Sequence, residues 1–378
     1  MSGNPIRVLQ IIGRMDRGGI ETMIMNIYRN IDREKVQFDF LAHYGREAAF
    51  NDEIRALGGR IYEMPALKDE TKGYYWRLFA YIKALKKFFD EHKEYKIIHC
   101  HMTNTAGIYM PIAKKRGITC IISHSHNTKA KHGLIGRVTD ILQKPICKYA
   151  TDMFACSEAA KNWFYPEDAI KNGKVKVIAN AVDADKFRFN EEKRIKMRKE
   201  LDLGDGITVV CVSRFRKEKN QIFLMEVLKK MKEKHNDAVF VFAGDGPCED
   251  EVKAKAKEYG LEKNTRFLGM RSDVPDILQA ADAFTLTSLW EGLPVAGIEA
   301  QASGLHCVVS DGVTEEMNAI GMVEYLSLDE PVEKWCEKLE AAALKPREDT
   351  YERIKSAGYD IHTTTPWLQN FYLSKHNQ

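Results

Sequence analysis

Short runs of β-branched and aromatic residues alternate with amphipathic stretches from one end of the chain to the other. Residues 7–12 and 207–213 are typical of buried strands, whereas residues 20–31 place apolar side chains at helical spacing. Strands that alternate with helices favour parallel sheets that are covered on both faces. The pattern therefore predicts an α/β protein built on doubly wound parallel sheets.

The alternation restarts after a charged helical stretch at residues 190–203, which indicates a second unit of similar size. A chain of 378 residues is also longer than one hydrophobic core usually supports. We expect an N-terminal domain over residues 1–188 and a C-terminal domain over residues 189–363. A last helix over residues 364–378 should pack back on the first domain.

The composition is that of a globular protein, with 44% hydrophobic and 29% charged residues. No segment approaches the roughly 18 apolar residues that a membrane span needs, and the N-terminus does not resemble a signal peptide. The eight cysteines are scattered without a C-x-x-C pair, which argues against a zinc ribbon and against a disulfide framework. We therefore expect a cytoplasmic protein.

The net charge of +3 hides a difference between the two halves. Residues 1–188 carry 31 Lys and Arg against 21 Asp and Glu, a net charge of +10, which leaves −7 for the remainder. A basic half indicates an anionic partner, either a membrane surface or a phosphorylated substrate, and an ordinary solvated surface is the alternative. We expect no nucleic-acid partner.

Glycines and basic residues follow predicted strands, where ligands of doubly wound sheets bind. Gly18 and Gly19 stand between the first strand and the first helix. They would let a phosphate approach the free N–H groups of the helix, unless they only form a turn.

Arg214 and Lys219 follow the strand at residues 207–213. Their charges suit a diphosphate, and a solvated basic loop is the alternative.

Two glutamates, Glu291 and Glu299, lie eight residues apart around a predicted helix start near Leu293. Free N–H groups of that helix would point back toward Glu291, and Glu299 would lie about two turns further along. Both carboxylates could accept hydrogen bonds from sugar hydroxyls. The alternative is a helix-capping acid followed by an exposed helix residue.

Histidines form two groups behind strands of the first domain: His99 with His101, and His124 with His126. Because alternate strand residues point to opposite faces, we expect at most one histidine of each pair to face a ligand. No acidic residue stands beside them. A zinc site is therefore not expected.

Over nearly its whole length the chain resembles glycosyltransferase family 4, most closely the bacterial branch that builds capsular or exopolysaccharide repeat units. Arg214 and Lys219 together with the two glutamates eight residues apart are more specific for this family than any one of these residues alone. The resemblance implies a GT-B fold, with two Rossmann-like domains that face one another across a cleft. The matching segments are residues 7–26, 122–128, 180–187, 212–220, 242–300 and 365–372.

By this resemblance, several residues would hold the nucleotide part of a donor. Gly19 would lie against the diphosphate, and the backbone of Val295 would meet a phosphate. Arg214 and Lys219 would bind the phosphates and stabilise the leaving nucleoside diphosphate. Glu299 would hold the ribose hydroxyls.

Other residues would hold the sugar and the base. Glu291 would bind the sugar hydroxyls, and Met270 would lie near the base. The histidine of the cleft would be His126, because a small polar residue, Asn127, follows it as in the family. His124 is the alternative. Backbone groups of three residues would also hold the sugar: Gly292, Leu293 and Pro294.

The resemblance also implies the reaction. A hexose or N-acetylhexosamine would be transferred from a nucleoside-diphosphate sugar to a glycan or a polyprenyl-diphosphate-linked sugar. The transfer would retain the anomeric configuration and use no cofactor or bound metal. A UDP-sugar is favoured as the donor over a GDP-sugar. Residues 83–89 and 112–117, both rich in lysine, could bring the first domain to the anionic inner face of the plasma membrane.

Three other classes of protein share parts of this pattern. A dinucleotide-dependent dehydrogenase would need G-x-G-x-x-G with a downstream acid, which is missing. An isomerase that acts on nucleotide sugars would lack this set of Arg, Lys and two Glu. A non-catalytic protein that binds a nucleotide sugar remains an alternative on sequence alone.

Overall fold

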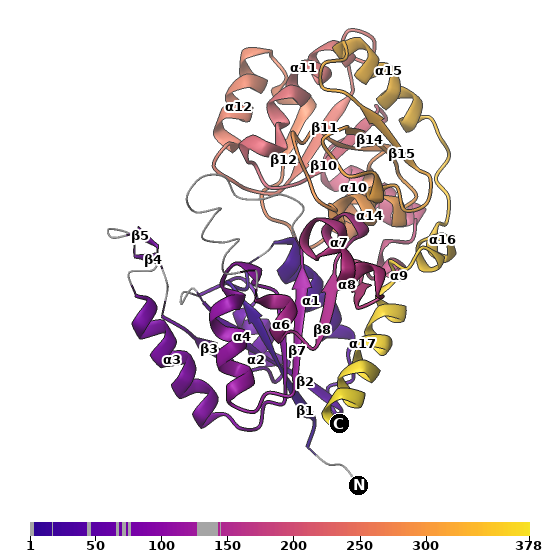
Figure 1. Ribbon diagram of the computed structural model, residues 1–378. Coiled ribbons are helices and arrows are strands. Elements are labelled where there is room, and N and C mark those ends of the chain that lie inside the picture. Colours follow the sequence, from indigo (N-terminus) through magenta and orange to yellow (C-terminus); the bar gives the residue numbers. More distant parts are fainter. Residues whose placement is uncertain are drawn as a thin grey trace. The chain divides into compact units, whose positions relative to one another are not determined.

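The computed structural model describes residues 4–16, 18–43, 47–65, 68–69, 73–74, 77–126, 143 and 145–378. The chain divides into two compact units (Figure 1): unit 1 comprises residues 1–181 and 361–378, and unit 2 comprises residues 182–360. The sequence analysis placed these boundaries after residues 188 and 363. The first falls earlier because helix α9 (Ala184–Phe187) buries Phe187 in the hydrophobic core of unit 2. The second falls earlier because the last helix already begins at Ile361, which is buried in a core of unit 1.

Unit 1 is built on a seven-stranded sheet whose order is β3-β2-β1-β6-β7-β8-β9, with every strand parallel to its neighbours. A separate antiparallel pair joins β4 to β5. The strands are β1 (Ile6–Ile12), β2 (Val36–Ala42), β3 (Ile61–Glu63), β4 (Lys68–Asp69), β5 (Gly73–Tyr74), β6 (Ile97–Cys100), β7 (Cys120–Ser125), β8 (Asp152–Ala155) and β9 (Val175–Val177).

Helices cover both faces of this sheet, because β1 buries side chains alternately in two separate cores. Val8 and Ile12 belong to the core beneath α1 and α17, whereas Leu9 and Ile11 belong to the core beneath α3 and α4. The helices of unit 1 are α1 (Gly19–Asn30), α2 (Asn51–Ala56), α3 (Leu78–Glu91), α4 (Ala106–Lys115), α6 (Ile146–Tyr149), α7 (Glu158–Phe164), α8 (Glu167–Lys171) and α17 (Ile361–His376), with a 3₁₀ turn at Thr103–Thr105.

The final helix of the chain, α17, packs on the first sheet although unit 2 lies between them in the sequence (Figure 1). Leu368 and Tyr372 enter the same core as Phe38 of β2, and the Tyr372 ring meets the Phe38 ring edge-on at 5.9 Å. The helix begins at Ile361, so that Pro366 lies inside it and not at its start.

Unit 2 repeats this plan with a six-stranded parallel sheet of order β12-β11-β10-β13-β14-β15. The two doubly wound parallel sheets confirm the predicted fold class. The strands are β10 (Thr208–Val212), β11 (Val239–Ala243), β12 (Thr265–Phe267), β13 (Ala283–Leu286), β14 (His306–Ser310) and β15 (Val323–Leu326). The helices are α9, α10 (Glu191–Glu200), α11 (Gln221–Met231), α12 (Glu249–Glu258), α13 (Val274–Ala280), α14 (Val295–Ala302), α15 (Val332–Ala343) and α16 (Tyr351–Ser356), with 3₁₀ turns at Lys217–Lys219, Glu262–Asn264 and Glu315–Met317.

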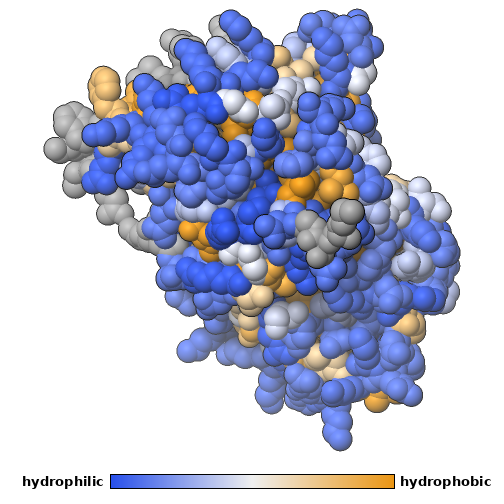
Figure 2. All heavy atoms as spheres, turned by 90° about the horizontal axis from the view of Figure 1, so that it is seen from below, coloured by the Kyte–Doolittle hydropathy of each residue, from blue (hydrophilic) through white to orange (hydrophobic). Residues whose placement is uncertain are grey.

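No helix among the described residues is long and apolar enough to cross a membrane. On the face of the molecule that Figure 2 shows, hydrophilic residues predominate and hydrophobic residues gather only in small patches.

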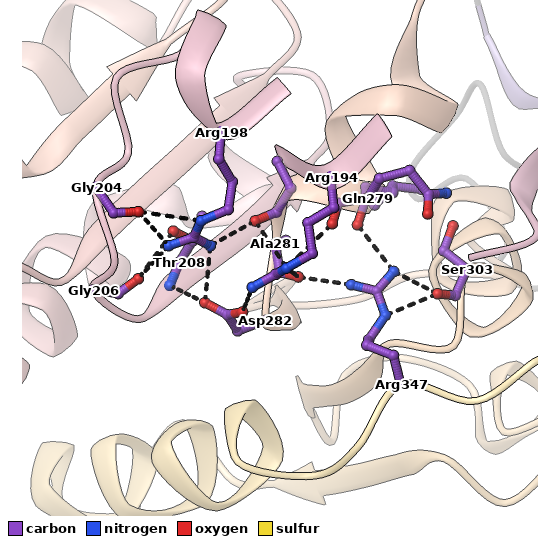
Figure 3. Close-up of polar contacts among 12 residues, drawn as sticks. Arg194, Arg198, Gly204, Gly206, Thr208, Gln279, Ala281, Asp282, Ser303 and Arg347 are labelled. Atoms are coloured by element: carbon purple, nitrogen blue, oxygen red, sulfur yellow. Dashed lines mark hydrogen bonds and ion pairs between the residues drawn. The ribbon is translucent and has the colours of Figure 1, made fainter. Parts of the chain in front are cut away.

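A network of arginines and one aspartate closes the amino-terminal edge of the second sheet (Figure 3). Asp282 accepts hydrogen bonds from Arg194 at 2.5 Å, from Arg198 at 3.3 Å and from the Thr208 amide at 2.7 Å. Nearby, Arg347 donates to the carbonyl oxygen of Ala281 at 2.7 Å. Burial, followed by the charge of Arg194, lowers the pKa of Arg347 to about 9. Asp282 is therefore the anion that offsets a cluster of partly desolvated guanidinium groups.

We expect Asp282→Asn to lower the free energy of unfolding of unit 2 by about 2–4 kcal/mol, because it leaves partly buried cations without their counter-ion. Urea unfolding followed by fluorescence measures this change. Asp276→Asn is the matched control, since Asp276 pairs with Lys193 of the same helix α10 but is 40% exposed. The control should lose less than about 1 kcal/mol, and equal losses in the two variants would contradict the prediction.

Candidate functional site

The predicted phosphate-binding residues of unit 2 lie in the loop that follows β10. Arg214 comes two residues after the strand ends, and Lys219 closes the 3₁₀ turn Lys217–Lys219. Asn220 then takes a left-handed backbone conformation, with φ of 50°, before α11 begins at Gln221. This turn directs the chain away from the sheet edge immediately after Lys219.

Lys219 and Glu291 form an ion pair that joins the loops after β10 and β13. Both side chains are 17% exposed, so the pair is partly desolvated and still open to a ligand. Ser288 donates a hydrogen bond of 3.0 Å to the same carboxylate oxygen of Glu291. The structure thus brings together two of the predicted site residues and adds Ser288, which the sequence analysis missed.

Backbone hydrogen bonds link the loops at the carboxyl ends of five neighbouring strands. The loop after β10 is bonded to the loops after β11 and β13, and these are bonded in turn to the loops after β12 and β14. The bonds run from Phe215 N to Asp245 O at 2.7 Å, from Gly244 N to Gly269 O at 2.8 Å, from Leu289 N to Glu218 O at 2.8 Å, and from Glu291 N to Gly312 O at 2.8 Å. The site residues of unit 2 therefore stand on loops that hold one another in place.

Arg214 and Met270 occupy the more open part of this edge. The Arg214 guanidinium lies 3.6 Å from a carboxylate oxygen of Asp245, and both side chains are about half exposed. Gln221 fixes the backbone of Arg214 by donating a hydrogen bond of 2.8 Å to its carbonyl oxygen. Met270 follows β12 and is 40% exposed. Both predicted residues are thus accessible to a ligand.

Helix α14 begins at Val295, two residues later than the sequence analysis predicted. Pro294 is its N-cap residue, with an extended backbone and no side-chain cap. Gly292, Leu293 and Pro294 therefore lie in the loop, with backbone groups that are not part of the helix. The later start also places Glu299 little more than one turn into the helix, where two turns were expected.

Glu299 has an unpaired carboxylate. None of the described residues donates a hydrogen bond to it or forms an ion pair with it, although its side chain is only partly accessible. Desolvation by burial raises the pKa of Glu299 from 4.5 to about 7. A carboxylate in such a place would gain most from a ligand that donates hydrogen bonds, such as a pair of vicinal hydroxyls.

In unit 1, Gly19 is the first residue of α1 and Gly18 is its N-cap. A side chain at Gly19 would meet no atom within 4 Å. The space that a Cβ at Gly19 would take is therefore open, whereas the Glu21 carboxylate lies against the neighbouring Gly18.

The four histidines of unit 1 gather in one cluster, so the argument that the two members of each pair point to opposite faces was wrong. Residues two apart on a strand project to the same face, not to opposite faces. His99 and His101 consequently stack with ring centroids 4.3 Å apart, and the rings of His124 and His126 are tilted with centroids 4.2 Å apart. Because β6 and β7 are neighbours, the two pairs also meet one another.

Hydrogen bonds join the histidines across the strands. His99 Nε2 lies 3.1 Å from His124 Nδ1, and His101 Nδ1 lies 2.9 Å from His126 Nε2. Burial lowers the pKa of all four imidazoles, that of His126 to about 3. The cluster is therefore neutral at physiological pH. His126 alone of the four keeps partial exposure, whereas His124 is 1% exposed.

This cluster also has the residue types of a metal site. Within the part of the chain that the structure describes, one nitrogen of each of His99, His101 and His124 lies within 4.8 Å of the others. The nitrogens of two histidines bound to one tetrahedral zinc ion would lie about 3.3 Å apart, which is closer than this 4.8 Å limit. The facing nitrogens of His99 and His124 already bond to one another, and no described carboxylate joins the group.

Several contributors to the site have no distinctive signal in the sequence. Ser288 could have been noticed, because it stands three residues before Glu291 in the loop after β13. Gln10, however, contacts His101 from a different strand, and Tyr372 contacts His99 from the far end of the chain. Only the folded chain brings these partners together. Asn127 lies outside the described residues.

Comparisons with known proteins concern the family and the fold of the chain. A family model described as Glycosyltransferase Family 4 matches residues 17–186, and one described as Glycosyl transferases group 1 matches residues 192–360. EpsF of Bacillus subtilis, which is named as a glycosyltransferase, is 33% identical over 98% of this chain and 97% of its own. CapH of Staphylococcus aureus, a capsular polysaccharide biosynthesis glycosyltransferase, is 25% identical over 98% of this chain and 99% of its own.

A third relative has a more specific name. The UDP-Gal:alpha-D-GlcNAc-diphosphoundecaprenol alpha-1,3-galactosyltransferase of Escherichia coli is 32% identical over 62% of this chain and 61% of its own. Among solved structures, Anabaena Alr3699/HepE in complex with UDP and glucose has a TM-score of 0.76 at 19% identity, covering 98% of this chain and 100% of its own. A glycosyltransferase from Rickettsia africae has a TM-score of 0.77 at 17% identity, with 99% of both chains covered. These likenesses concern the fold.

The raised pKa of Glu299 makes stability depend on pH. Because the folded state holds the Glu299 proton up to about pH 7 and the unfolded state releases it near 4.5, this residue should cost stability increasingly as pH rises between these values. The cost should reach up to about 3 kcal/mol above pH 7. Glu299→Gln should therefore gain stability relative to the wild type between pH 5 and pH 8 in urea unfolding. Parallel stability curves for the two proteins would contradict this.

Proposed function

The chain belongs to glycosyltransferase family 4, and we propose that it moves a hexose or N-acetylhexosamine from a nucleoside-diphosphate sugar to a glycan or lipid-linked acceptor. The transfer proceeds with retained anomeric configuration and without a bound metal. The observation that carries this proposal is the carboxyl edge of the second sheet, where the paired Lys219 and Glu291 stand with the unpaired Glu299. Cations for phosphates and carboxylates for hydroxyls occur together there.

The basic residues and the start of α14 would stabilise the leaving nucleoside diphosphate. When the bond between the anomeric carbon and the phosphate oxygen breaks, the electron pair stays on the diphosphate. Arg214, Lys219 and the backbone amide of Val295 offer positive charge and N–H donors to that oxygen. One preorganised contact of this kind contributes about 2.7–4 kcal/mol in the transition state. This chain can thus supply the charge stabilisation that a metal supplies in other enzymes.

The carboxylates would divide the rest of the donor between them. Glu299, which has no partner among the described residues, would accept hydrogen bonds from the ribose hydroxyls. Glu291, held by Lys219 and Ser288, would accept them from the sugar, with the loop backbone of Gly292–Pro294 beside it. No protein nucleophile is part of this proposal.

Three further residues complete the proposed donor site. Met270, which is 40% exposed, would lie near the base. In unit 1, Gly19 would lie against the diphosphate, since the space beside it is open. His126 would meet the sugar, because His124 is too deeply buried to reach a ligand.

The names of the relatives support a UDP-sugar donor and an acceptor in bacterial surface polysaccharide synthesis. The Escherichia coli relative is named for a UDP-Gal donor and a diphosphoundecaprenol acceptor, and CapH is named for capsular polysaccharide. The Anabaena structure holds UDP and glucose. We extend this donor and acceptor chemistry to the present chain, with UDP favoured over GDP.

Unit 1 would meet the lipid-linked acceptor at the inner face of the plasma membrane. Lys83, Lys86 and Lys87 are exposed on α3, and Lys114 and Lys115 are exposed at the end of α4. Phe88 and Phe89, next to these lysines, take no part because they are 5% and 1% exposed, whereas Phe79 in the first turn of α3 is 89% exposed. Most of the attraction would come from charge, at about 1 kcal/mol for each lysine near an anionic surface.

Replacing either Lys219 or Glu299, two charged residues proposed to bind the donor, should abolish most of the transfer. We expect Lys219→Ala to lower kcat about 10²–10³-fold, because it removes a cation that faces the leaving group, and Glu299→Ala to lower kcat/KM sharply. A thermal-shift panel of nucleotide sugars selects the donor, and release of nucleoside diphosphate in the presence of acceptor measures transfer.

The matched control is Lys217→Ala, the same change two residues earlier at an exposed position of the same turn. It should keep transfer within about threefold of the wild type. Near-normal transfer by both Lys219→Ala and Glu299→Ala, with circular dichroism showing folded proteins, would refute the site assignment.

Charge reversal on α3 tests the membrane proposal. The double variant Lys86→Glu, Lys87→Glu should lower co-sedimentation with vesicles rich in phosphatidylglycerol at least tenfold, since two attractive charges become repulsive. The control is Lys171→Glu, Lys174→Glu, which reverses two exposed charges on and just after α8 of the same unit. Equal binding by the two double variants, or wild-type binding that ignores anionic lipid, would refute this proposal.

A further inference from the structure

Two hydrogen bonds from a buried amide join the end of β10 to the first residue of α11 in unit 2. Gln221, which is 2% exposed, donates from Nε2 to the hydroxyl oxygen of Ser213 at 2.9 Å and to the carbonyl oxygen of Arg214 at 2.8 Å. Ser213 directly follows β10 and is partly exposed. One amide group thus contacts both residues with which the loop after β10 begins.

The carbonyl group of Arg214 fixes the direction of these hydrogen bonds. A carbonyl oxygen can only accept, so the Gln221 amide must face it with the nitrogen and not with the oxygen. The same nitrogen then donates to Ser213, and the hydroxyl oxygen of Ser213 acts as the acceptor. The Ser213 proton consequently points away from Gln221.

Among the described residues, the Ser213 hydroxyl has one further hydrogen-bonding neighbour, the thiol of Cys211, with Sγ 3.4 Å from Oγ. Sulfur is a weak acceptor, and the thiol can itself donate to the hydroxyl oxygen. The Ser213 proton therefore lacks a strong acceptor among the described residues. A phosphate oxygen would be a strong one, because hydrogen bonds to charged groups are about twice as strong as those between neutral groups.

The Ser213 side chain lies on the face of β10 that is turned toward the ion pair of Lys219 and Glu291. Cys211 and Ser213 are two residues apart, so their side chains project to the same face. Burial raises the pKa of the Cys211 thiol to about 11, and the contact with Ser213 opposes this rise. The charges of Lys219 and Glu291 act on the same pKa in opposite directions. Ser213 is closer than Cys211 to the carboxyl edge of the sheet, where these charges stand.

We propose that the Ser213 hydroxyl is a further ligand of the diphosphate, and that Gln221 is the positioning residue that turns its proton toward the site. The hydroxyl donates to a phosphate oxygen beside Arg214 and Lys219, and it adds a neutral hydrogen-bond donor to the two cations. This inference rests on the proposed function for the nucleotide sugar to which the diphosphate belongs. The contact between Ser213 and a diphosphate can be tested without that sugar.

Inorganic pyrophosphate tests the contact by itself. Ser213→Ala should weaken the binding of pyrophosphate in titration calorimetry about tenfold, the loss expected for one hydrogen bond to a charged group. The matched control is Ser327→Ala, the same change directly after β15 of the same sheet, where the hydroxyl accepts a hydrogen bond from the Asp329 amide. The control should bind within about twofold of the wild type. An unchanged affinity in Ser213→Ala, or equal losses in the two variants, would overturn the proposal.

A comparison of UDP with uridine distinguishes a phosphate contact from a structural role. In NMR titrations, Ser213→Ala should weaken the binding of UDP about tenfold but keep the binding of uridine, which carries no phosphate, within about twofold of the wild type. Equal weakening of UDP and uridine would mean that Ser213 only maintains the loop, which would contradict the proposal.

A double-mutant cycle tests the role of Gln221. Gln221→Glu replaces the amide nitrogen by a carboxylate oxygen, to which the Ser213 hydroxyl would donate its proton. Because the diphosphate has then already lost this donor, adding Ser213→Ala should weaken pyrophosphate binding by less than about twofold more. A carboxylate that merely repels the phosphates would leave the full tenfold effect of Ser213→Ala, and this result would refute the role of Gln221. If Gln221→Glu does not fold, the single variant Ser213→Ala still decides whether the hydroxyl binds the diphosphate.

These measurements separate the inference from the proposed function. A wild type that binds pyrophosphate through Ser213 but transfers sugar from no donor would refute the transferase function and leave the phosphate contact standing. Sugar transfer by a wild type whose Ser213→Ala variant binds pyrophosphate equally well would refute only the contact. A wild type that binds no pyrophosphate would refute both.

Discussion

Parallel strands that are buried on both faces leave only their ends for polar chemistry. Along β10 and β13 nearly every side chain lies in the core, because helices cover both faces of the sheet and unpaired polar groups would be costly there. The chain therefore places its charged and hydroxyl groups in the loops after these strands. Lys219, Ser288 and Glu291 meet in that way, although about 70 residues separate Lys219 from the other two.

Partial desolvation gives these loop residues their properties. Lys219 and Glu291 form an ion pair at 17% exposure, in which the attraction between the two charges offsets part of their desolvation. Glu299 has no such partner among the described residues, and desolvation therefore raises its pKa to about 7. A ligand that brings phosphates and hydroxyls would supply partners for groups that the free protein satisfies only in part. The partial desolvation of these charged side chains thus costs free energy in the unbound protein and at the same time makes them able to bind a ligand.

Unit 1 follows the same constraint with neutral groups in place of charges. Its four histidines stand at the ends of β6 and β7, where burial keeps the imidazoles neutral and hydrogen bonds between them replace solvent. Gln10 is a buried polar side chain inside strand β1, and its amide oxygen contacts His101 of this cluster. The network of Asp282 with Arg194 and Arg198 lies at the opposite edge of the second sheet, where we expect it to stabilise the fold.

The amino-acid sequence by itself determined the class of fold and the position of the candidate residues along it. The spacing of apolar residues indicates which side of each strand or helix is buried. The occurrence of Arg214 and Lys219 together with two glutamates eight residues apart can likewise be seen in the sequence alone. Tertiary structure decided what those residues touch: the start of α14 at Val295, the gathering of four histidines on one face, and the contact of Tyr372 with His99. Such contacts join residues far apart in the chain, and the pKa of Glu299 depends on everything packed around it. No local pattern contains that information, because desolvation and hydrogen-bond direction are properties of the folded surroundings.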